Sequence, residues 1–465
     1  MDTPVTVVIL AAGLGTRMKS RRAKVLHEAG GRTLIEHTVD TALSLAEPEH
    51  VFVVVGHQAD QVRGAVEGRG VRFIQQTEQK GTGHALIAAR ESLAHLGGLL
   101  VVYYGDCPLI PAVLLTALVA HQERSVAAAT LVTAELEDPT GYGRVIRDGS
   151  GPVRAIVEQK AATPEQLAVR EANVGIYCFQ AGPFWKHIDE LRPDNPAREY
   201  YLTDMIEILI RAGHTIDAYR AANAMELLGI NNRVELAAAD RTFRERKVRE
   251  LMLAGVTVEK PETVSVDHSV SIGIDTVIEP FAQILGNTTI GEACRIGACS
   301  IVRDSELADG VQVGAFTIIS SSRAGAGAQI GPYSRLRVDN DVAPGAHIGN
   351  FVELKKTRMG AGAKANHLAY LGDSIVGENV NVGAGTITCN YDGRAKHQTK
   401  IGKDVFVGSN STLVAPLEIG DGAYLAAGSV ITDRVPPDAL ALGRARQIIK
   451  EDWARKRREK TTTKH

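Results

Sequence analysis

The stretch "NTTIGEACRIGACS", residues 287–300, contains the dipeptide Ile-Gly twice, six positions apart. Ile or Val followed by Gly recurs through the second half of the chain, with the aliphatic residue at Ile272, Ile290, Ile296, Val313, Ile330, Ile348, Val376, Val382, Ile401, Val407 and Ile419. The successive spacings along the chain are 18, 6, 17, 17, 18, 28, 6, 19, 6 and 12, which cluster on six and on three times six. A six-residue repeat with a fixed aliphatic position is the signature of a parallel β-helix. We therefore predict three flat faces per coil, with aliphatic side chains on the axis and small residues at the corners.

One spacing departs from this rule. The longest interval, between Ile348 and Val376, contains "LKKTRMGAGAKANHLAYLGDS", residues 354–374. The excess predicts an insertion of about ten residues in one coil, and insertions in solenoids usually carry function.

The first half of the chain has a different texture. Apolar runs at 5–12, 50–55, 98–106, 127–136 and 172–179 alternate with amphipathic stretches such as 33–45 and 83–96. This alternation predicts a largely parallel α/β sheet with helices on both faces, whose ligands bind at the carboxyl ends of the strands. Residues 227–256 are predicted to form one long charged helix. The domain boundaries expected from these patterns are 1–231, a linker helix at 232–255, a β-helix at 256–449 and a basic tail at 450–465.

Bulk properties exclude several classes of protein. At 465 residues the chain is too long for a single ordinary core. A formal charge of −2 argues against a nucleic-acid partner. The absence of a charged leader, and of an apolar run long enough to span a bilayer, predicts a soluble, cytoplasmic protein with no membrane partner. Five cysteines without a C-x-x-C pair favour small, buried, reduced thiols over a disulfide framework or a zinc site.

The segment "LAAGLGTRM", residues 10–18, ends the first predicted strand in a glycine-rich, cationic loop. Gly13 and Gly15 permit backbone angles closed to other residues, so several N–H groups can converge on an anion at a helix N-terminus. Arg17 and Lys24 add positive charge, and the loop is predicted to bind phosphate. It is not a dinucleotide fingerprint, because Met18 stands where a third glycine is needed, and no Gly-Lys-Ser/Thr of a Walker A loop follows.

The same segment resembles the signature of sugar-1-phosphate nucleotidylyltransferases. Six further motifs occur in order: "GTGHA" (81–85), "YGD" (104–106), "DPTGYGR" (138–144), "GINNR" (229–233), "HLAYLGD" (367–373) and "NVNVGAGTITCNYDG" (379–393). Together they resemble the bifunctional bacterial GlmU family, in which a glucosamine-1-phosphate N-acetyltransferase is joined to an N-acetylglucosamine-1-phosphate uridylyltransferase. The resemblance implies a left-handed β-helix, a homotrimer, Mg²⁺, and the substrates glucosamine-1-phosphate, acetyl-CoA, N-acetylglucosamine-1-phosphate and UTP.

For the uridylyl reaction, positioning and charge neutralisation are the main requirements. Asp106 directly follows an apolar strand, where it is either a metal ligand or an N-cap for the helix expected after Pro108. The resemblance implies that Asp106 and Asn231 hold Mg²⁺, an ion that takes few protein ligands, and that Arg17 and Lys24 are the catalytic cations. The substrate contacts that it implies are Leu10, Ala11, Ala12, Gly13, Gln76, Gly81, Thr82, Tyr104, Gly105, Gly141, Glu158, Asn173 and Asn231.

For the acetyl reaction, a histidine titrates in the range that a base acting on an amine needs. The resemblance implies that His367 is this base, although a histidine in a loop is more often an ordinary surface residue. One histidine also argues against the zinc-dependent hydratases built on the same helix, which need three. The residues implied to hold the amino-sugar phosphate are Arg337, Lys355, Tyr370, Asn381, Asn390, Tyr391 and Lys396. Those implied for acetyl-CoA, in a groove between neighbouring β-helices, are Ala384, Ser409, Ala427 and Arg444.

Three positions depart from the family pattern: Ala23 replaces a proline, Val174 replaces a threonine, and Val338-Asp339 replaces Pro-Gly after Arg337. The basic tail is expected to be solvated and frayed beyond Arg444 and Trp453, or to help hold CoA phosphates. Two other functions stay open on the sequence. One is a single-activity nucleotidylyltransferase whose β-helix only oligomerises, and the other is a non-catalytic regulatory subunit.

Overall fold

The computed structural model describes residues 3–149 and 151–462. The chain divides between Arg244 and Glu245 into two compact units, each with its own cores. None of the helices in the described ranges is both long enough and apolar enough to cross a membrane.

In the described part of the first unit, nine strands form one sheet with the order β11-β7-β10-β6-β1-β4-β5, and β8 and β9 extend from β10. Strands β1, β4, β5 and β6 are parallel, β11 is parallel to β7, and β10 is antiparallel to β6 and β7. The strands are β1 Val5–Ala11, β4 Val51–Val55, β5 Arg72–Gln75, β6 Leu99–Tyr104, β7 Ala129–Glu135, β8 Gly143–Arg147, β9 Val153–Val157, β10 Glu171–Gln180 and β11 Ile216–Arg220. A separate hairpin pairs β2 Glu28–Ala29 with β3 Arg32–Thr33. The predicted mostly parallel α/β sheet is confirmed.

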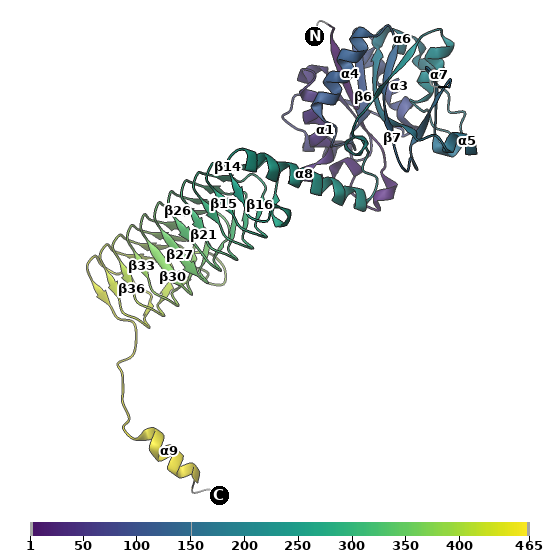
Figure 1. Ribbon diagram of the computed structural model, residues 1–465. Helices are drawn as coiled ribbons and strands as arrows, with labels where there is room; N and C mark the ends of the chain where they lie inside the picture. The colour runs from purple at the N-terminus through teal and green to yellow at the C-terminus, as the bar shows by residue number, and fades with distance from the viewer. Residues whose placement is uncertain (1–2, 150, 463–465) are drawn as a thin grey trace. The chain divides into compact units, whose positions relative to one another are not determined.

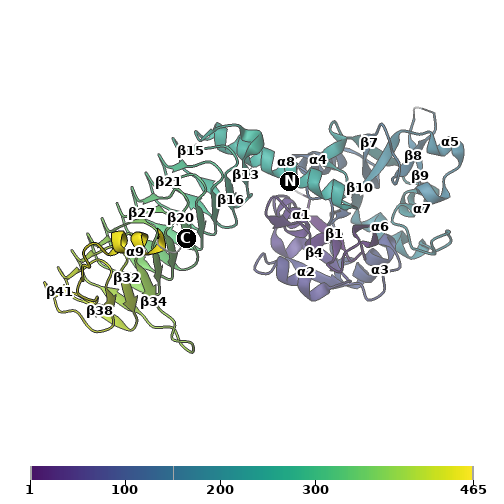
Figure 2. The ribbon, with the colours of Figure 1, turned by 90° about the horizontal axis from the view of Figure 1, so that it is seen from below.

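Helices cover both faces of this sheet because alternate strand residues face opposite cores. Val7 and Ile9 of β1 pack in a core with α1, α2 and α4, whereas Val8 and Leu10 pack in another with α3, α6 and α7. In Figure 2, α1 and α2 lie beside β1 and β4. The helices are α1 Leu34–Leu43, α2 Ala59–Ala65, α3 Thr82–Leu93, α4 Ala112–Arg124, α5 Pro164–Leu167, α6 Ala181–His187, α7 Asp204–Arg211 and α8 Arg233–Leu253.

The long charged helix is shorter than predicted. Helix α8 begins at Arg233 rather than at residue 227. Asn232 Oδ1 accepts hydrogen bonds from the N–H groups of Val234 (2.9 Å) and Glu235 (3.0 Å), which makes Asn232 an N-cap. A cap requires non-helical backbone, so "LLGIN" before it stays outside the helix.

The second unit is a left-handed β-helix, as predicted, with short parallel strands stacked coil upon coil (Figure 1). We call its three sheets the first, second and third face. The first face contains β12 Thr257–Val258, β15 Val277–Ile278, β18 Arg295–Ile296, β21 Gln312–Val313, β24 Gln329–Ile330, β27 His347–Asn350, β30 Lys364–His367, β33 Asn381–Val382, β36 Phe406–Val407, β39 Tyr424–Leu425 and β41 Leu440–Ala441. The second contains β13 Ser265–Val266, β16 Gln283–Leu285, β19 Ile301–Arg303, β22 Ile318–Ser320, β25 Arg335–Leu336, β28 Glu353–Lys355, β31 Tyr370–Gly372, β34 Ile387–Cys389, β37 Thr412–Val414 and β40 Val430–Ile431. The third contains β14 Ser271–Ile272, β17 Thr289–Ile290, β20 Glu306–Leu307, β23 Ser322–Ala324, β26 Asn340–Val342, β29 Arg358–Met359, β32 Ser374–Val376, β35 Thr399–Ile401 and β38 Leu417–Ile419.

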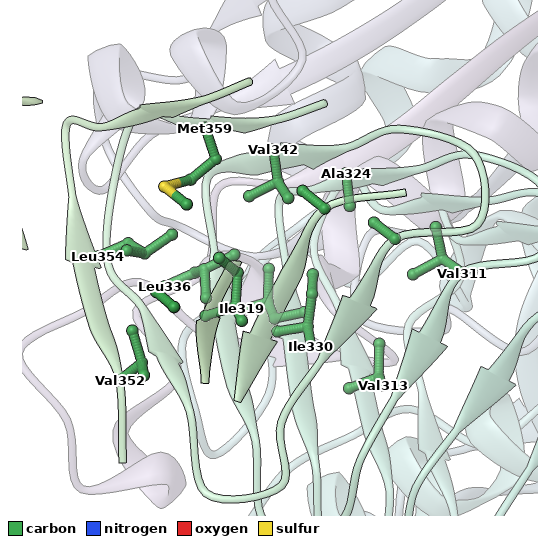
Figure 3. Close-up of a cluster of buried hydrophobic side chains, with 14 of the residues drawn as sticks. Val311, Val313, Ile319, Ala324, Ile330, Leu336, Val342, Val352, Leu354 and Met359 are labelled. Carbon is green, nitrogen blue, oxygen red and sulfur yellow. The ribbon is translucent and has the colours of Figure 1, made fainter. Parts of the chain in front are cut away.

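The axial aliphatic side chains form the core of the β-helix. Figure 3 shows Val313, Ile319 and Leu336, from the first and second faces, pointing into the interior between the strands. Ile319 and Leu336 are fully buried. Each coil places its axial residues directly over those of the previous coil, since Val313 pairs with Ile330 and Ile319 with Leu336. This stacking lets one coil's apolar surface cover the next.

The expected insertion is misplaced. Arg358 pairs with Ile375 in the next coil of the third face. The number of residues between these two partners equals the number between Val313 and Ile330, so the coil that contains His367 has the ordinary length. The following coil is longer, because the partner of Ile375 on the third face is Lys400. The eight extra residues lie within the nine-residue segment 390–398 between β34 and β35, where Figure 2 shows a loop projecting beside β34. The pattern failed because Met359 and Ala365 fill axial positions that Ile or Val followed by Gly fills elsewhere.

Two smaller expectations are also corrected. In the described ranges all five cysteines are free thiols, but Cys299 and Cys389 are half-buried, while Cys107, Cys178 and Cys294 are buried. Within the basic tail, residues Trp453–Thr462 form helix α9 instead of a frayed coil, and Arg457 lies over the Trp453 ring. The remainder of the tail, 463–465, lies outside the described residues.

Candidate functional site

The glycine-rich loop after β1 depends on one of its two glycines for its shape. Gly15 has a φ of 61°, and a Cβ there would lie 2.6 Å from Lys24 Cβ, so glycine lets the lysine backbone approach. Gly13, contrary to expectation, is not left-handed, and apart from its two chain neighbours no described residue has an atom within 4 Å of a Cβ built on it. The predicted helix N-terminus is only the single 3₁₀ turn Thr16–Met18.

The predicted catalytic cations meet the predicted metal ligands in this unit. Arg17 Nη2 donates to Asn231 Oδ1 at 2.7 Å, and Lys24 Nζ donates to the same oxygen at 3.3 Å. Lys24 also forms an ion pair with Asp106. The N-cap alternative for Asp106 is wrong, because α4 begins at Ala112 and is preceded by Pro111.

The oxygen set suits Mg²⁺. Asp106 contributes a carboxylate and Asn231 an amide oxygen, and both already face the same ammonium group of Lys24. Within residues 3–149 and 151–462 there is no cluster of three or more His, Cys, Asp or Glu able to hold a metal. Mg²⁺ needs no such cage, since it keeps several waters and is commonly bound by one or two protein oxygens with substrate phosphates.

A residue that the sequence analysis missed fixes Asn231. Glu235 Oε2 accepts the Asn231 N–H at 2.6 Å, and Glu235 Oε1 accepts from the Asn232 side chain. The signal was present, because an Asn followed three residues later by Glu is a capping-box pattern.

The predicted nucleotide contacts gather at the ends of neighbouring strands. Gly105 N–H donates to Leu10 O at 3.0 Å, which joins the ends of β6 and β1. Gln76 is 3% exposed, and its Nε2 donates to Gly81 O at 3.1 Å. The Thr82 hydroxyl accepts from Leu202 N–H at 3.1 Å. Beside them, Ala11 and Ala12 are buried at the end of β1.

The predicted sugar contacts form a second group in the same unit. Asn173 Nδ2 donates to the Tyr177 hydroxyl at 2.7 Å. Thr203 donates to Glu158 Oε1 at 3.3 Å, and burial raises the pKa of the Glu158 carboxyl. Burial likewise raises the pKa of the Tyr104 hydroxyl, which stays neutral. Gly141 lies in an exposed turn, and its N–H donates to Gln159, the chain neighbour of Glu158.

In the second unit, three predicted cations gather at the corner after the second face. Arg337 directly follows β25 and Lys355 ends β28, the neighbouring strand of the second face. Arg337 donates to Glu353 at 3.2 Å. The inserted loop 390–398 brings Lys396 beside Lys355. The neighbouring Lys396 is the main cause of a lowered Lys355 pKa; burial and Arg337 act the same way, while Asp373 opposes them. Three cations whose charges disfavour one another are suited to an anion such as a sugar phosphate.

Polar side chains flank these cations. Asn390 donates to Asp373, a partner that the sequence analysis missed. A Cβ on Gly372 would lie 2.5 Å from the Tyr370 hydroxyl and 2.8 Å from Asn390 Nδ2, so glycine admits both groups. Tyr391 is exposed and pairs with Lys396 across the inserted loop. Asn381 stands on the outer side of the first face, in register with Lys364.

His367 is the last residue of β30, at the corner where the chain turns into the second face, and it is exposed. The next coils place the predicted acetyl-CoA residues on that same corner. Gly385 N–H donates to Leu368 O, Asn410 N–H to Ala384 O, and Gly428 N–H to Ser409 O. These bonds stack His367, Ala384, Ser409 and Ala427 in one column, and the column ends where Arg444 approaches Gly428.

Both units are similar to known protein families. Residues 7–176 match the MobA-like NTP transferase domain, and residues 269–304 and 398–433 match the bacterial transferase hexapeptide family of six repeats. The chain is 64% identical to the Bifunctional protein GlmU of Solibacter usitatus, over 100% of this chain and 99% of the relative. It is 50% identical to that of Koribacter versatilis, over 97% of each, and 48% identical to that of Anaeromyxobacter sp., over 99% and 95%.

Proposed function

The chain belongs to the GlmU family, and from this premise we propose that it is a bifunctional transferase. The β-helix unit acetylates glucosamine-1-phosphate with acetyl-CoA. The α/β unit then joins the N-acetylglucosamine-1-phosphate to UTP, giving UDP-N-acetylglucosamine and pyrophosphate. The observation that carries the uridylyl half is the convergence of Arg17, Lys24 and Asp106 with Asn231.

In the uridylyl reaction, a sugar phosphate oxygen attacks the α-phosphorus of UTP and pyrophosphate leaves, so two anions must approach each other. Arg17 and Lys24 neutralise the triphosphate and the developing charge of the leaving group. Asp106 and Asn231 would hold Mg²⁺, which when bound supplies further charge neutralisation at the phosphates. Glu158 and Asn173 position the sugar, and Gln76 and Thr82 the uracil.

In the acetyl reaction, the cations Arg337, Lys355 and Lys396 hold the sugar phosphate, and Tyr370, Asn381 and Asn390 surround the ring. His367 accepts a proton from the attacking amine, and the exposed column of Ala384, Ser409 and Ala427 holds acetyl-CoA. A scaffold that only oligomerises would not require His367 to share one corner with these positions, so this column weighs against a single-activity enzyme.

We also propose a homotrimer. His367 and the cations Arg337 and Lys355 lie at opposite ends of the second face, because His367 precedes β31 whereas Lys355 ends β28, the strand paired with β31. A neighbouring β-helix packed along that face would close the exposed site between them, and cyclic symmetry would make three such sites. The domain limits of this proposal are 1–231, 232–255, 256–449 and 450–465, and the free thiols suit a cytoplasmic location.

A paired assay tests the whole proposal. Purified protein receives Mg²⁺, UTP and glucosamine-1-phosphate, with acetyl-CoA added or withheld, and free CoA and pyrophosphate are measured together. We expect pyrophosphate only in the presence of acetyl-CoA. If CoA is never released while N-acetylglucosamine-1-phosphate still yields pyrophosphate, the β-helix is a scaffold.

A further inference from the structure

The turn between β4 and α2 touches the phosphate-binding loop on both sides. His57 N–H donates to Ala12 O at 3.4 Å, where β1 ends. Gln58, the next residue, reaches the far side of the loop: its Oε1 accepts the Ala23 N–H at 2.7 Å, and its Nε2 donates to Arg21 O at 2.7 Å. One side chain therefore holds the two peptide groups on either side of Arg22, shortly before Lys24.

Gln58 holds this position at a conformational cost. Its φ is 55° and its ψ is 40°, a left-handed backbone conformation that is unfavourable for residues with a Cβ. Such backbone persists where surrounding contacts over-determine it, and it marks candidate functional positions. Here the contacts are the two hydrogen bonds to the loop.

We propose that Gln58 is a positioning residue for uridylyl transfer, one that fixes the loop of residues 19–23 and so sets where Lys24 meets the UTP phosphates. The proposal rests on the proposed uridylyl function. Lys24 follows Ala23 directly, and its ammonium contacts both Asp106 and Asn231. Release of the loop would let Lys24 leave that arrangement, although Gln58 itself touches no substrate group.

The same contact explains how the loop tolerates Ala23 in place of the proline typical of the resembling enzymes. Ala23 has a φ of −56°, within the range that a proline ring imposes. A proline would fix this angle covalently but would lack the N–H that Gln58 accepts. In this chain a hydrogen bond from a distant turn performs the restraint.

The first test is Gln58→Ala in the full-length protein with Mg²⁺. Loss of two hydrogen bonds predicts a rise of about tenfold in the KM for UTP, while the KM for N-acetylglucosamine-1-phosphate stays within about twofold. Because the acetyl site lies in the other unit, the KM for N-acetylglucosamine-1-phosphate, which binds in the same unit as UTP, serves as the internal measure of folding. The matched control is Gln166→Ala, which also removes a glutamine bonded to backbone, at Thr163, and should leave both KM values unchanged.

The second test is a double-mutant cycle with Ala23→Pro. In the Gln58→Ala background, the proline should restore the KM for UTP to within about threefold of the starting protein, because it fixes φ without the lost bond. In the unchanged background it should give no improvement, since it removes the donor that Gln58 Oε1 needs. If Gln58→Ala does not accumulate as folded protein, Gln58→Glu is measured instead, since it keeps an acceptor for Ala23 and loses the donor to Arg21.

Two outcomes would overturn the inference: a KM for UTP within about twofold of the starting protein in Gln58→Ala, or equal rises in both KM values with additive effects in the cycle. Failure of the proposed function looks different, because then the unsubstituted protein itself releases no pyrophosphate from UTP and N-acetylglucosamine-1-phosphate.

Discussion

The two units of this chain build their candidate sites by opposite means. In the α/β unit, Arg17 bonds to Asn231, a residue 214 positions away, and Lys24 bonds to Asn231 from 207 positions away. In the β-helix, the predicted sugar contacts all lie between residues 337 and 396, and the strand register stacks them. A site of the first kind needs the whole unit to close correctly, whereas one of the second kind follows from a few neighbouring coils.

The difference also determines how each site is restrained. In the α/β unit, Glu235 and Gln58 each hold one loop with a pair of hydrogen bonds. In the β-helix, backbone hydrogen bonds between successive coils hold the corners in place. The inserted loop 390–398, which brings Lys396 to the site, departs from this repeat.

The largest effect should come from substitutions that inactivate one site and leave the other intact. His367→Ala removes the proposed base, which predicts a loss of about 10²–10⁴-fold in acetyl transfer. Pyrophosphate release from UTP and N-acetylglucosamine-1-phosphate should be unchanged, because His367 belongs to the other unit. Steady-state rates of CoA and pyrophosphate release measure both.

The reciprocal variant is Lys24→Ala, which should lower pyrophosphate release and leave CoA release unchanged. Near-normal acetyl transfer in His367→Ala would remove His367 from the mechanism. A loss of both activities in either variant would mean that the units do not act independently.

Next in size are matched cavities in the two cores. Leu354→Ala in the β-helix and Leu100→Ala in the sheet each remove a side chain that is at most 2% exposed. Each should lower the free energy of unfolding of its own unit by about 2–5 kcal/mol. Denaturant titrations that follow the acetyl and uridylyl activities separately should show a shift only in the unit that carries the cavity. Equal shifts in both midpoints would show instead that the units unfold as one.

The smallest effect concerns the cation cluster. Lys396 lowers the pKa of Lys355, so Lys355 loses its charge, and its hold on the sugar phosphate, at a lower pH than an ordinary lysine. In Lys396→Met the pKa of Lys355 should rise, which moves the alkaline increase in the KM for glucosamine-1-phosphate to higher pH. Near neutral pH, where Lys355 is charged in both proteins, the KM should be larger in the variant, since one cation is gone.

The pH profile of that KM, compared with the profile of Lys400→Met, checks this. Lys400 pairs with Glu418 on the third face and should not affect the profile. An unchanged alkaline limb in Lys396→Met would mean that Lys355 does not govern phosphate binding.

Much of the architecture was accessible from the sequence because it depends on local periodicity. The six-residue repeat predicted the β-helix, since each face contributes one aliphatic side chain to the axis and this spacing can be read directly from the sequence. The alternation of apolar runs and amphipathic stretches predicted the α/β sheet for the same reason. The one error in the repeat, the insertion, arose where Met359 and Ala365 occupy axial positions without the usual dipeptide.

The repeat, the sheet, the cationic loop and, through its motifs, the family could thus be predicted from the amino-acid sequence alone. Only the tertiary structure decided that Gly15 but not Gly13 is left-handed, that the insertion delivers Lys396 to Lys355, and that Gln58 restrains the loop before Lys24. The physical reason is that these features depend on pairs of groups far apart along the chain. Their meeting is fixed by packing and hydrogen-bond geometry, which leave no periodic trace in the sequence.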